Sequence, residues 1–353
     1  MKKFLAFLLA AIMCLALCAC GSSSSGGSAE TTGGDSAYAK LAPVELILAD
    51  STGKGAAGQV FNEYIAKRLP EITDGKLTVD YHPNGDLGGD ADLFRQMQSN
   101  DIQIVLCQMA PTVNFIPENA VFDLPMVFSK YDGDTIDKVL NGDNDFTAAL
   151  GAAYEKVGLH LLGFLQNATY RLTTANRDLS TLEDFKGLQI RTMENKNHMA
   201  FWTAIGAEPT PLAWGEVYIS LDNHTIDAQE NAADTCVGAN FQEVQKYLAC
   251  TNHILYCNQI CINKEAYEAL DPAYQAALNQ AVQEAIAFMR PQLEQIDKDN
   301  KQILVDGGMT LIEYDAAFYD TILNLDGVKA LYKQIDEEQI DGLGTLLVNE
   351  LNK

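Results

Sequence analysis

The chain has 353 residues, of which 24 are Lys or Arg and 48 are Asp or Glu, so its formal net charge is −24. This length is enough for two globular domains of ordinary size. Such an acidic surface argues against nucleic acid and anionic lipid as partners. It leaves room for a small anionic ligand in a cleft, because salt screens surface charge within roughly 8 Å at physiological strength.

Residues 1–19 have the pattern of an export signal. MKK supplies positive charge, and FLAFLLAAIMCLAL is an apolar run too short to span a membrane. Leu17–Cys20 fits a bacterial lipobox, in which Cys20 becomes the lipidated first residue; an ordinary secretory signal cut nearby is the alternative. Residues 20–43 read as a flexible, Gly/Ser-rich tether. We therefore expect an exported protein, lipid-anchored at the outer face of the cytoplasmic membrane, in the periplasm or at the cell surface.

Strand-like and helix-like segments alternate after the tether. The predicted strands are 44–50, 76–83, 102–109 and 159–167, and the helices between the first three are 56–69 and 91–100. The third strand is apolar enough to be buried on both faces. This βαβαβ order predicts a parallel sheet with right-handed crossovers.

Gly53–Gly58 match the spacing G-x-G-x-x-G between a predicted strand and a predicted helix, and Asp80 ends the next strand. This is the pattern of a dinucleotide site. Two facts count against it: an exported protein meets little NAD(P), and no catalytic acid–base set accompanies the motif. We expect instead a glycine-rich turn that starts a helix beside the sheet edge, where Asp50 and Ser51 can line a pocket.

A second α/β unit is predicted further along the chain. LQIRT (188–192) and TIDAQEN (225–231) bracket two helical patterns at 196–205 and 214–223. A long helical pattern then runs from Asp271 to about Val305; some 30 residues span about 45 Å, more than one small domain. Pro272 suits its first turn, and Pro291 predicts a kink. Two more helices, 316–324 and 327–335, close the second domain.

The cysteines and histidines indicate neither a disulfide framework nor a metal site. Five cysteines follow the lipobox, an odd number at scattered positions: Cys107, Cys236, Cys250, Cys257 and Cys261. We expect buried free thiols, with one pair among the last three as the alternative. The histidines lack metal-ligand spacing: His82, His160, His198, His224 and His253. We expect no metal and no cofactor.

The stretch 170–263 resembles the solute-binding proteins of TRAP (tripartite ATP-independent periplasmic) transporters. The matching motifs are Lys186-Gly187-Leu188, Ile190-Arg191, Gly206-Ala207, Pro209, Pro211, Glu216-Val217-Tyr218 and Asp227–Asn231, with DGKLTVDYHPNGDLGG and AVFDLPMVF upstream. Ala228 departs from the glycine usual in the family. The resemblance implies an α/β, two-domain periplasmic-binding-protein-like fold with a hinge and a long helix spanning both domains. Domain I would be 45–168 plus 257–295, and domain II 169–256 plus 296–353.

The resemblance also implies a function. Family members close on an organic acid, such as sialic acid or a C4-dicarboxylate, and pass it to an ion-gradient-driven membrane permease. A monomer that is not an enzyme is expected, and the sequence does not name its acid. The alternative is a solute receptor for an ABC transporter or a sensor kinase. An enzyme and a structural or adhesive lipoprotein are rival classes, but no Ser/His/Asp or Cys/His signature supports an enzyme.

Arg191 lies near the end of the strand 188–192, and the resemblance implies that it forms a salt bridge to the ligand carboxylate. A planar, permanently charged guanidinium suits that role. The alternative is a surface arginine paired with Glu183, Asp184 or Glu194. The other implied contacts are Arg171 and Asn231 on the carboxylate, Trp214 as an aromatic wall and Gln108 from the other domain; Ser51 joins them at the sheet edge. The alternative for Arg171 is a solvated charge at a strand end, and for Asn231 a residue that caps a local turn. The alternative for Trp214 is a tryptophan that is simply buried.

Overall fold

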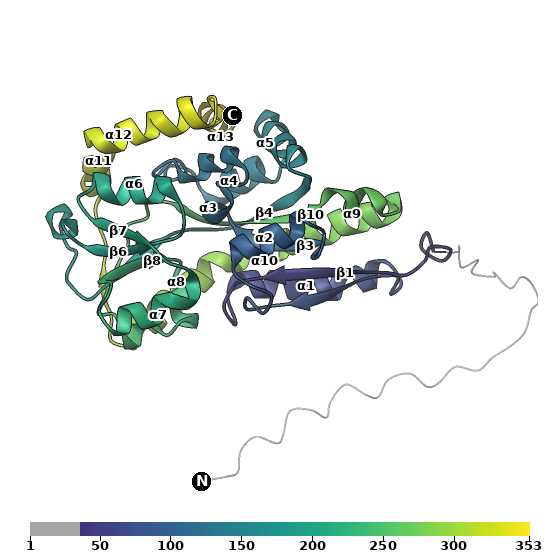
Figure 1. Ribbon diagram of the computed structural model, residues 1–353, viewed down its shortest axis with the longest axis horizontal. Coiled ribbons are helices and arrows are strands. Elements are labelled where there is room, and N and C mark those ends of the chain that lie inside the picture. Colours follow the sequence, from purple (N-terminus) through teal and green to yellow (C-terminus); the bar gives the residue numbers. More distant parts are fainter. Residues whose placement is uncertain (1–35) are drawn as a thin grey trace, which may run out of the picture. The chain divides into compact units, whose positions relative to one another are not determined.

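Two β-sheets organise residues 36–353, the part of the chain that this computed structural model describes, apart from the side chains of 167 and 168. The predicted signal peptide, Cys20 and most of the predicted tether lie outside these residues. Residues 37–353 form one unit (Figure 1). Within residues 36–353, no helix combines the length and apolarity needed to cross a membrane.

Sheet A has five strands in the order β2-β1-β3-β10-β4. Their bounds are β1 Val44–Asp50, β2 Leu77–His82, β3 Ile104–Gln108, β4 Leu159–Tyr170 and β10 Leu255–Asn263. β1 pairs in parallel with both β2 and β3, which confirms the arrangement predicted from the βαβαβ order. β10, in contrast, runs antiparallel to β3 and β4. The sheet is therefore mixed, with a late strand inserted beside an early one.

Both faces of β3 are buried, as its apolar run predicted. Ile104 and Leu106 enter the same core as Phe61 of α1 (Ala57–Ile72). The alternate residues Val105 and Cys107 enter the core that contains Phe94 of α2 (Asp90–Gln98). Because strand side chains alternate between faces, one short segment anchors helices on both sides of the sheet.

Sheet B has six short strands in the order β11-β9-β5-β8-β6-β7. Their bounds are β5 Leu172–Ala175, β6 Gln189–Thr192, β7 Glu208–Pro211, β8 Ala228–Asn231, β9 Tyr247–Ala249 and β11 Thr310–Ile312. β6 is parallel to β7 and β8, whereas β5 is antiparallel to β8 and β9. The helices of this part are α6 Lys196–Ala204, α7 Trp214–Asp222 and α8 Ala233–Gly238.

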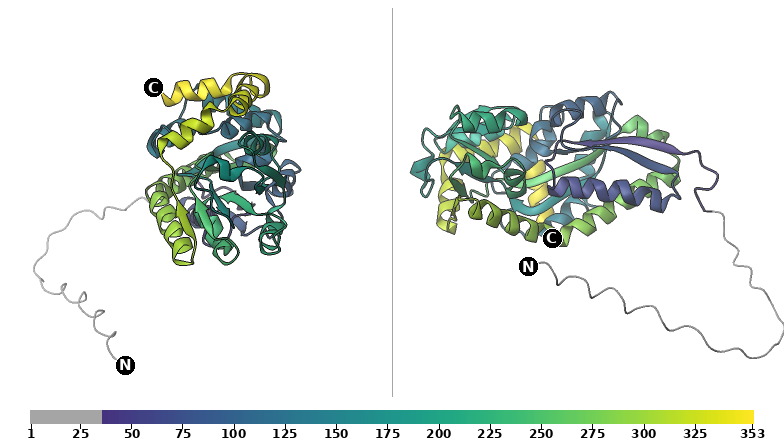
Figure 2. Two further views of the ribbon diagram at one scale, coloured as in Figure 1. Left: turned by 90° about the vertical axis from the view of Figure 1, so that its left-hand side faces the viewer. Right: turned by 90° about the horizontal axis from the view of Figure 1, so that it is seen from below.

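One long helix, α10 (Pro272–Asp306), packs against elements of both sheets (Figures 1 and 2). Its 35 residues span roughly 50 Å. Proline occupies the first turn, where the Asp271 carboxylate caps Ala273 N at 2.9 Å. Leu278 joins the core beneath sheet A, and Leu304 joins a core of sheet B. The predicted long helix is therefore present, and it connects the cores of the two sheets.

The C-terminal helices lead from the sheet B part of the fold back to the helices of sheet A. α12 (Asp326–Lys333) packs on α6, while α13 (Leu343–Leu351) packs on α4 (Gly133–Leu140) and α5 (Asp145–Lys156). The remaining α-helices are α3 Met109–Thr112, α9 Lys264–Ala269 and α11 Ala316–Asn324. At the other end, Tyr38 stacks on Tyr274 of α10 with ring centroids 5.9 Å apart. The division of the body into domains at 168–169, 256–257 and 295–296 stays a prediction.

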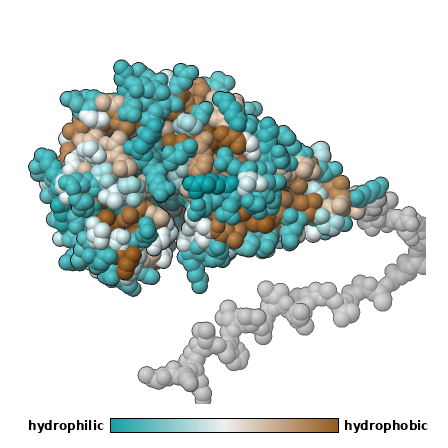
Figure 3. Space-filling model, in the orientation of Figure 1, coloured by the Kyte–Doolittle hydropathy of each residue, from teal (hydrophilic) through white to brown (hydrophobic). Residues whose placement is uncertain are grey.

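The surface in Figure 3 is largely hydrophilic, as the acidic composition indicates. Hydrophobic atoms gather where Figure 1 places α7, whose Ile219 is more than half exposed.

All five cysteines beyond residue 100 are buried and free. The prediction of buried free thiols is confirmed.

Candidate functional site

The candidate site lies where sheet A meets sheet B. Gln108 ends β3 of sheet A, and its Oε1 accepts a hydrogen bond from Arg171 Nη1 at 2.6 Å. Asn195, before α6, donates to Ala110 O at 3.0 Å. The backbone N–H of Ala57, at the start of α1, donates to the Asp234 carboxylate at 3.1 Å. These hydrogen bonds join the two sheets' elements directly, so the structure is a closed one.

Arg191 lies in β6 with only 3% of its surface exposed. Its Nε and Nη2 donate to Leu212 O at 2.9 and 2.7 Å. Its Nη1 is buried and has no hydrogen-bond partner among the described residues. The guanidinium lies over the Trp214 ring, 5.8 Å from its centroid. A buried donor without an acceptor costs free energy comparable to a lost hydrogen bond, so Nη1 marks a place where an acceptor fits.

No carboxylate of the described residues forms an ion pair with Arg191. Two of its three expected surface partners are engaged elsewhere: Glu183 pairs with Lys186, and Asp184 accepts from Thr181. Burial lowers the pKa of Arg191 to about 10, although Glu230 acts in the opposite direction. The guanidinium therefore stays charged at neutral pH. A buried cation of this kind is stable only where an anion can reach it.

Arg171 is buried too, with 2% of its surface exposed, and is not the solvated strand-end charge that was the alternative. Its Nε pairs with the Glu230 carboxylate, and Nη2 donates to Glu230 O at 2.9 Å. Its guanidinium lies 5.7 Å from the centroid of the Tyr256 ring. Arg171 Nη1 donates to the amide oxygen of Gln108. This oxygen therefore occupies a position that a carboxylate oxygen of a ligand could take.

Glu230 is the centre of a buried polar network that the sequence did not reveal. His253 Nε2 lies 3.2 Å from its carboxylate, and His198 Nδ1 lies 3.8 Å away. His198 Nε2 in turn lies 3.0 Å from Asp123. Burial works against the charged form of Glu230, but Arg171 and the two histidines hold its pKa well below the usual range. Glu230 is thus a fixed counter-ion behind Arg171.

The two histidines differ in charge. Burial opposes protonation of His198, yet its hydrogen bond to Asp123 and the nearby Glu230 raise its pKa to about 9. Burial dominates at His253, and its pKa is lowered. His198 is therefore an imidazolium at neutral pH. No signal in the sequence joins Asp123 to His198, because 75 residues separate them.

The remaining expected contacts lie around the two arginines. Asn231 ends β8, is buried, and its Oδ1 accepts from Ala232 N at 3.1 Å. Trp214 begins α7, is half-buried, and meets Phe241 edge-on at 5.7 Å. Ser51 follows β1 and donates its hydroxyl to Asp90, a residue that sequence reasoning did not single out. The structure brings all six predicted residues to one region, and contact of each with a ligand stays a prediction.

The glycine-rich turn brings the start of α1 against a carboxylate of the protein itself. The Asp234 carboxylate accepts a hydrogen bond from the first backbone N–H of α1, so that donor already has a partner. A Cβ on Gly58 would lie 2.6 Å from Thr52 Cγ2 and 3.1 Å from Leu106, so glycine is required for close packing of α1 on the sheet edge. The motif thus has the structural role that we expected of it.

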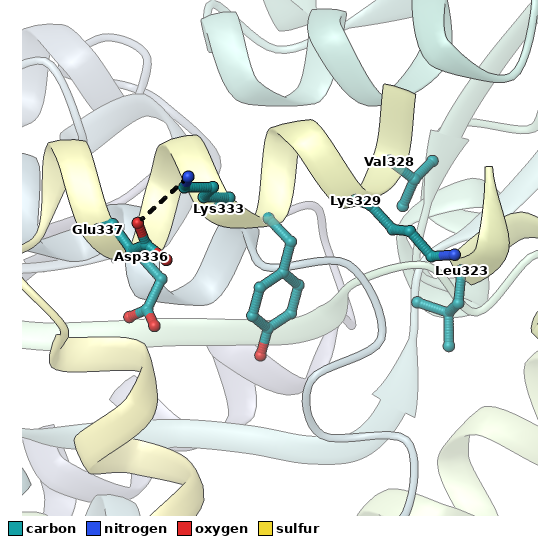
Figure 4. Close-up of a pocket in the computed structure, with 7 residues that line it drawn as sticks. Leu323, Val328, Lys329, Lys333, Asp336 and Glu337 are labelled. Atoms are coloured by element: carbon teal, nitrogen blue, oxygen red, sulfur yellow. Dashed lines mark ion pairs between the residues drawn. The ribbon is translucent and has the colours of Figure 1, made fainter. Parts of the chain in front are cut away.

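Two hollows differ in their relation to this site. One, of about 390 Å³, lies on α11, α12 and the π-helical segment Gln334–Gln339 that follows (Figure 4). Its charged side chains include Lys333 and Glu337, 3.8 Å apart and largely exposed. The other adjoins Arg171, Gln108 and His198 and has a volume of about 10 Å³, room for one water molecule. An organic acid can therefore enter beside Arg171 only if the sheets separate or Gln108 withdraws.

Within residues 36–353, no cluster of His, Cys, Asp or Glu could hold a metal ion.

Two β-sheets with their covering helices are connected by one long helix and are closed over two buried arginines. This arrangement defines a two-lobed binding protein of the periplasmic type. A family model described as bacterial extracellular solute-binding protein, family 7, matches residues 52–343. The chain therefore belongs to this family, the solute-binding proteins of TRAP transporters. Its members serve transport by binding solutes and are not enzymes in general.

Relatives and solved structures agree with this assignment. The sialic acid-binding periplasmic protein SiaP of Vibrio cholerae is 30% identical over 220 residues, covering 62% of this chain and 67% of SiaP. The sugar acid-binding protein of Advenella mimigardefordensis, solved with galactonate, superposes with a TM-score of 0.80 at 26% identity, covering 88% of this chain and 99% of its own. A TRAP periplasmic protein of Shewanella oneidensis, solved with succinate, gives 0.80 at 25% identity and coverages of 88% and 100%.

Proposed function

We propose that this protein captures an organic acid by a salt bridge between Arg191 and the ligand carboxylate, and delivers it to an ion-gradient-driven TRAP permease. The observation that carries the proposal is the buried, unpartnered Nη1 of Arg191. Leu212 O fixes the plane of the guanidinium through two hydrogen bonds and leaves this donor for an incoming oxygen. Galactonate, succinate and sialic acid, the ligands of similar proteins, all carry a carboxylate.

Capture requires the two sheets to separate and close again about a hinge. In the open form the carboxylate meets Arg191, and on closure Arg171 takes the second oxygen as Gln108 Oε1 moves away. The Asn231 amide donates to the same carboxylate, and Trp214 covers the guanidinium of Arg191. Lipidation of Cys20 would hold the protein, as a monomer, beside the permease at the outer face of the membrane.

The first experiment is a thermal-shift screen of organic acids, because a ligand that binds only the folded form raises the unfolding temperature. Calorimetry with the best ligand then compares variants. Arg191→Ala should lower affinity at least a hundredfold without unfolding the protein, since an unpaired buried carboxylate costs several kcal/mol. Arg191→Lys should also bind weakly, because an ammonium cannot reproduce the fixed fork.

The matched control is Arg177→Lys, which alters an exposed arginine in the same part of the chain that donates to Lys186 O at 2.9 Å. This variant should keep the affinity of the unchanged protein. Arg191→Ala protein that is folded and binds the acid as tightly as the parent would overturn the assignment of Arg191.

A further inference from the structure

Helix α1 has no N-cap of its own. Ala56 precedes its first residue, and the methyl group of alanine cannot accept a hydrogen bond; the first turn of the helix also holds no acidic residue. The first N–H groups of a helix have no acceptor within it, and they form the positive end of the helix dipole. Among the described residues, the side chain that accepts from this end is that of Asp234, 3.1 Å from Ala57 N.

This cap comes from the opposite sheet. Asp234 lies in the first turn of α8, shortly after β8 of sheet B, whereas α1 follows β1 of sheet A. A second contact lies at the other end of α8, where a Cβ on Gly238 would be 3.9 Å from Lys54 O. Both α1 and α8 pack on α10 (Figure 1). The glycine-rich turn before α1 and the helix α8 are therefore parts that the proposed hinge motion would separate.

The contact is buried in the closed structure. Only 7% of Asp234 and 4% of Ala57 are exposed, and the second oxygen of Asp234 accepts from Thr235 N at 2.7 Å. Burial raises the pKa of Asp234, while the hydrogen bonds from Ala57 and Thr235 act in the opposite direction. Without the Asp234 oxygen, a buried N–H of α1 would have no acceptor, which costs free energy comparable to a lost hydrogen bond.

We infer that Asp234 is a positioning residue for ligand retention: its oxygen caps α1 only while the two sheets are closed, and this cap slows release of the bound acid. The inference rests on the proposed function, since the acid must leave through the opened sheets. In the open form water can reach both the N–H and the carboxylate, so the cap stabilises the closed form alone. Loss of an N-cap to alanine would shift this balance by roughly threefold to thirtyfold.

The test compares three variants of the full mature protein. The probe is whichever of galactonate, succinate and sialic acid gives the largest thermal shift. Asp234→Ala should speed its dissociation, measured by stopped-flow displacement, by roughly threefold to thirtyfold and leave association nearly unchanged. Asp234→Asn keeps an acceptor oxygen for Ala57 N and should stay within about threefold of the parent rate. Asp222→Asn, exposed at the end of α7, is the matched control and should keep the parent rate.

Amide hydrogen exchange at Ala57, followed by NMR, reports on the cap itself. In the parent protein the bound acid should slow this exchange at least about fivefold, because the N–H is then held against Asp234. Asp234→Ala should abolish the slowing, and Asp234→Asn should retain it. The ligand-free unfolding temperature of Asp234→Ala should match that of the parent, since the cap belongs to the closed form.

Failure of the cap and failure of the proposed function give different results. If Asp234→Ala releases the acid at the parent rate while Arg191→Ala abolishes binding, the inference is wrong and capture by Arg191 stands. Exchange at Ala57 that is equally slow without the acid would place the cap in the open form too, which also overturns the inference. Release from Asp234→Asn as fast as from Asp234→Ala would assign the effect to charge and reject the cap. If none of the three acids binds the parent protein, the proposed function fails, and this inference fails with it.

Discussion

His198 holds a proton between two buried carboxylates, Asp123 and Glu230. Asn195 and Asn197 donate to the same Asp123 at 2.8 and 2.9 Å, so the start of α6 is tied to the segment before Leu124. Since Glu230 pairs with Arg171, the position of the candidate ligand arginine depends on this histidine. His198 thus acts on the position of Arg171 through its charge, by way of Glu230.

His198→Asn should lower the free energy of unfolding by roughly 3–5 kcal/mol, because it leaves Asp123 and Glu230 without a shared cation. Urea unfolding at pH 7 measures the loss. His82→Asn breaks a solvent-accessible pair with Asp80, and should change stability by less than about 1 kcal/mol. Equal losses in the two variants would contradict the role of His198.

The same residue predicts a pH dependence. The pKa of His198 is raised to about 9 in the folded protein and is about 6.5 in an unfolded chain. Its stabilisation is therefore complete below pH 6.5 and is lost as the pH rises through 9, since the folded state holds the extra proton in that window. Urea midpoints should fall from pH 7 to 9 in the parent protein. If His198→Asn shows the same fall, the proton lies elsewhere.

Sequence reasoning found the candidate ligand-binding residues at strand ends. It missed the buried charged residues that hold those residues in position. Arg191, Gln108 and Asn231 lie at or next to the last residue of predicted strands, and the resemblance supplied their roles. Asp123 and Glu230 carry charges that only the packing of distant segments brings to His198. Asp90 had a weak signal, an acidic residue at the start of a helix that follows a parallel strand, but nothing in the sequence placed it beside Ser51 and Gln108.

At the scale of elements, the start of α1 depends on close approach to the sheet edge. Gly58→Ala should destabilise the protein by about 1–3 kcal/mol, because the added methyl group meets Thr52, whose hydroxyl is fixed to Asp50 at 2.6 Å. Gly53→Ala, with no atom within 4 Å of the added Cβ, should be close to neutral. Urea unfolding compares the two. A neutral Gly58→Ala would show that α1 can shift freely.

Local patterns predicted most elements, and non-local pairing accounts for what they missed. The strands 44–50 and 102–109 and the helix 271–305 match β1, β3 and α10 within a few residues. The antiparallel insertion of β10 between β3 and β4 was not predicted. Its residues pair with partners more than 80 positions earlier in the chain, and periodicity carries no information about such partners.

At the scale of the whole molecule, burial keeps the thiols protonated and out of reach. It raises the pKa of all five cysteines beyond residue 100, to about 12 at Cys236 and about 11 at Cys250. Because the thiolate is the reactive form, iodoacetamide should label none of them in native protein and all of them in urea. Peptide mass spectrometry identifies each site. Ser180→Cys, at an exposed position, is the reactive control. Rapid native labelling at Cys257 would contradict its burial.

The place of β10 has a consequence for how the polypeptide matures. As synthesis proceeds, β3 emerges some 150 residues before the strand that covers its free side. Until then a hydrophobic edge with unsatisfied backbone groups is open to pairing with other chains. We expect the nascent protein to depend on holding chaperones until residue 263 has emerged, and truncations before that point to aggregate rather than to yield a folded N-terminal half.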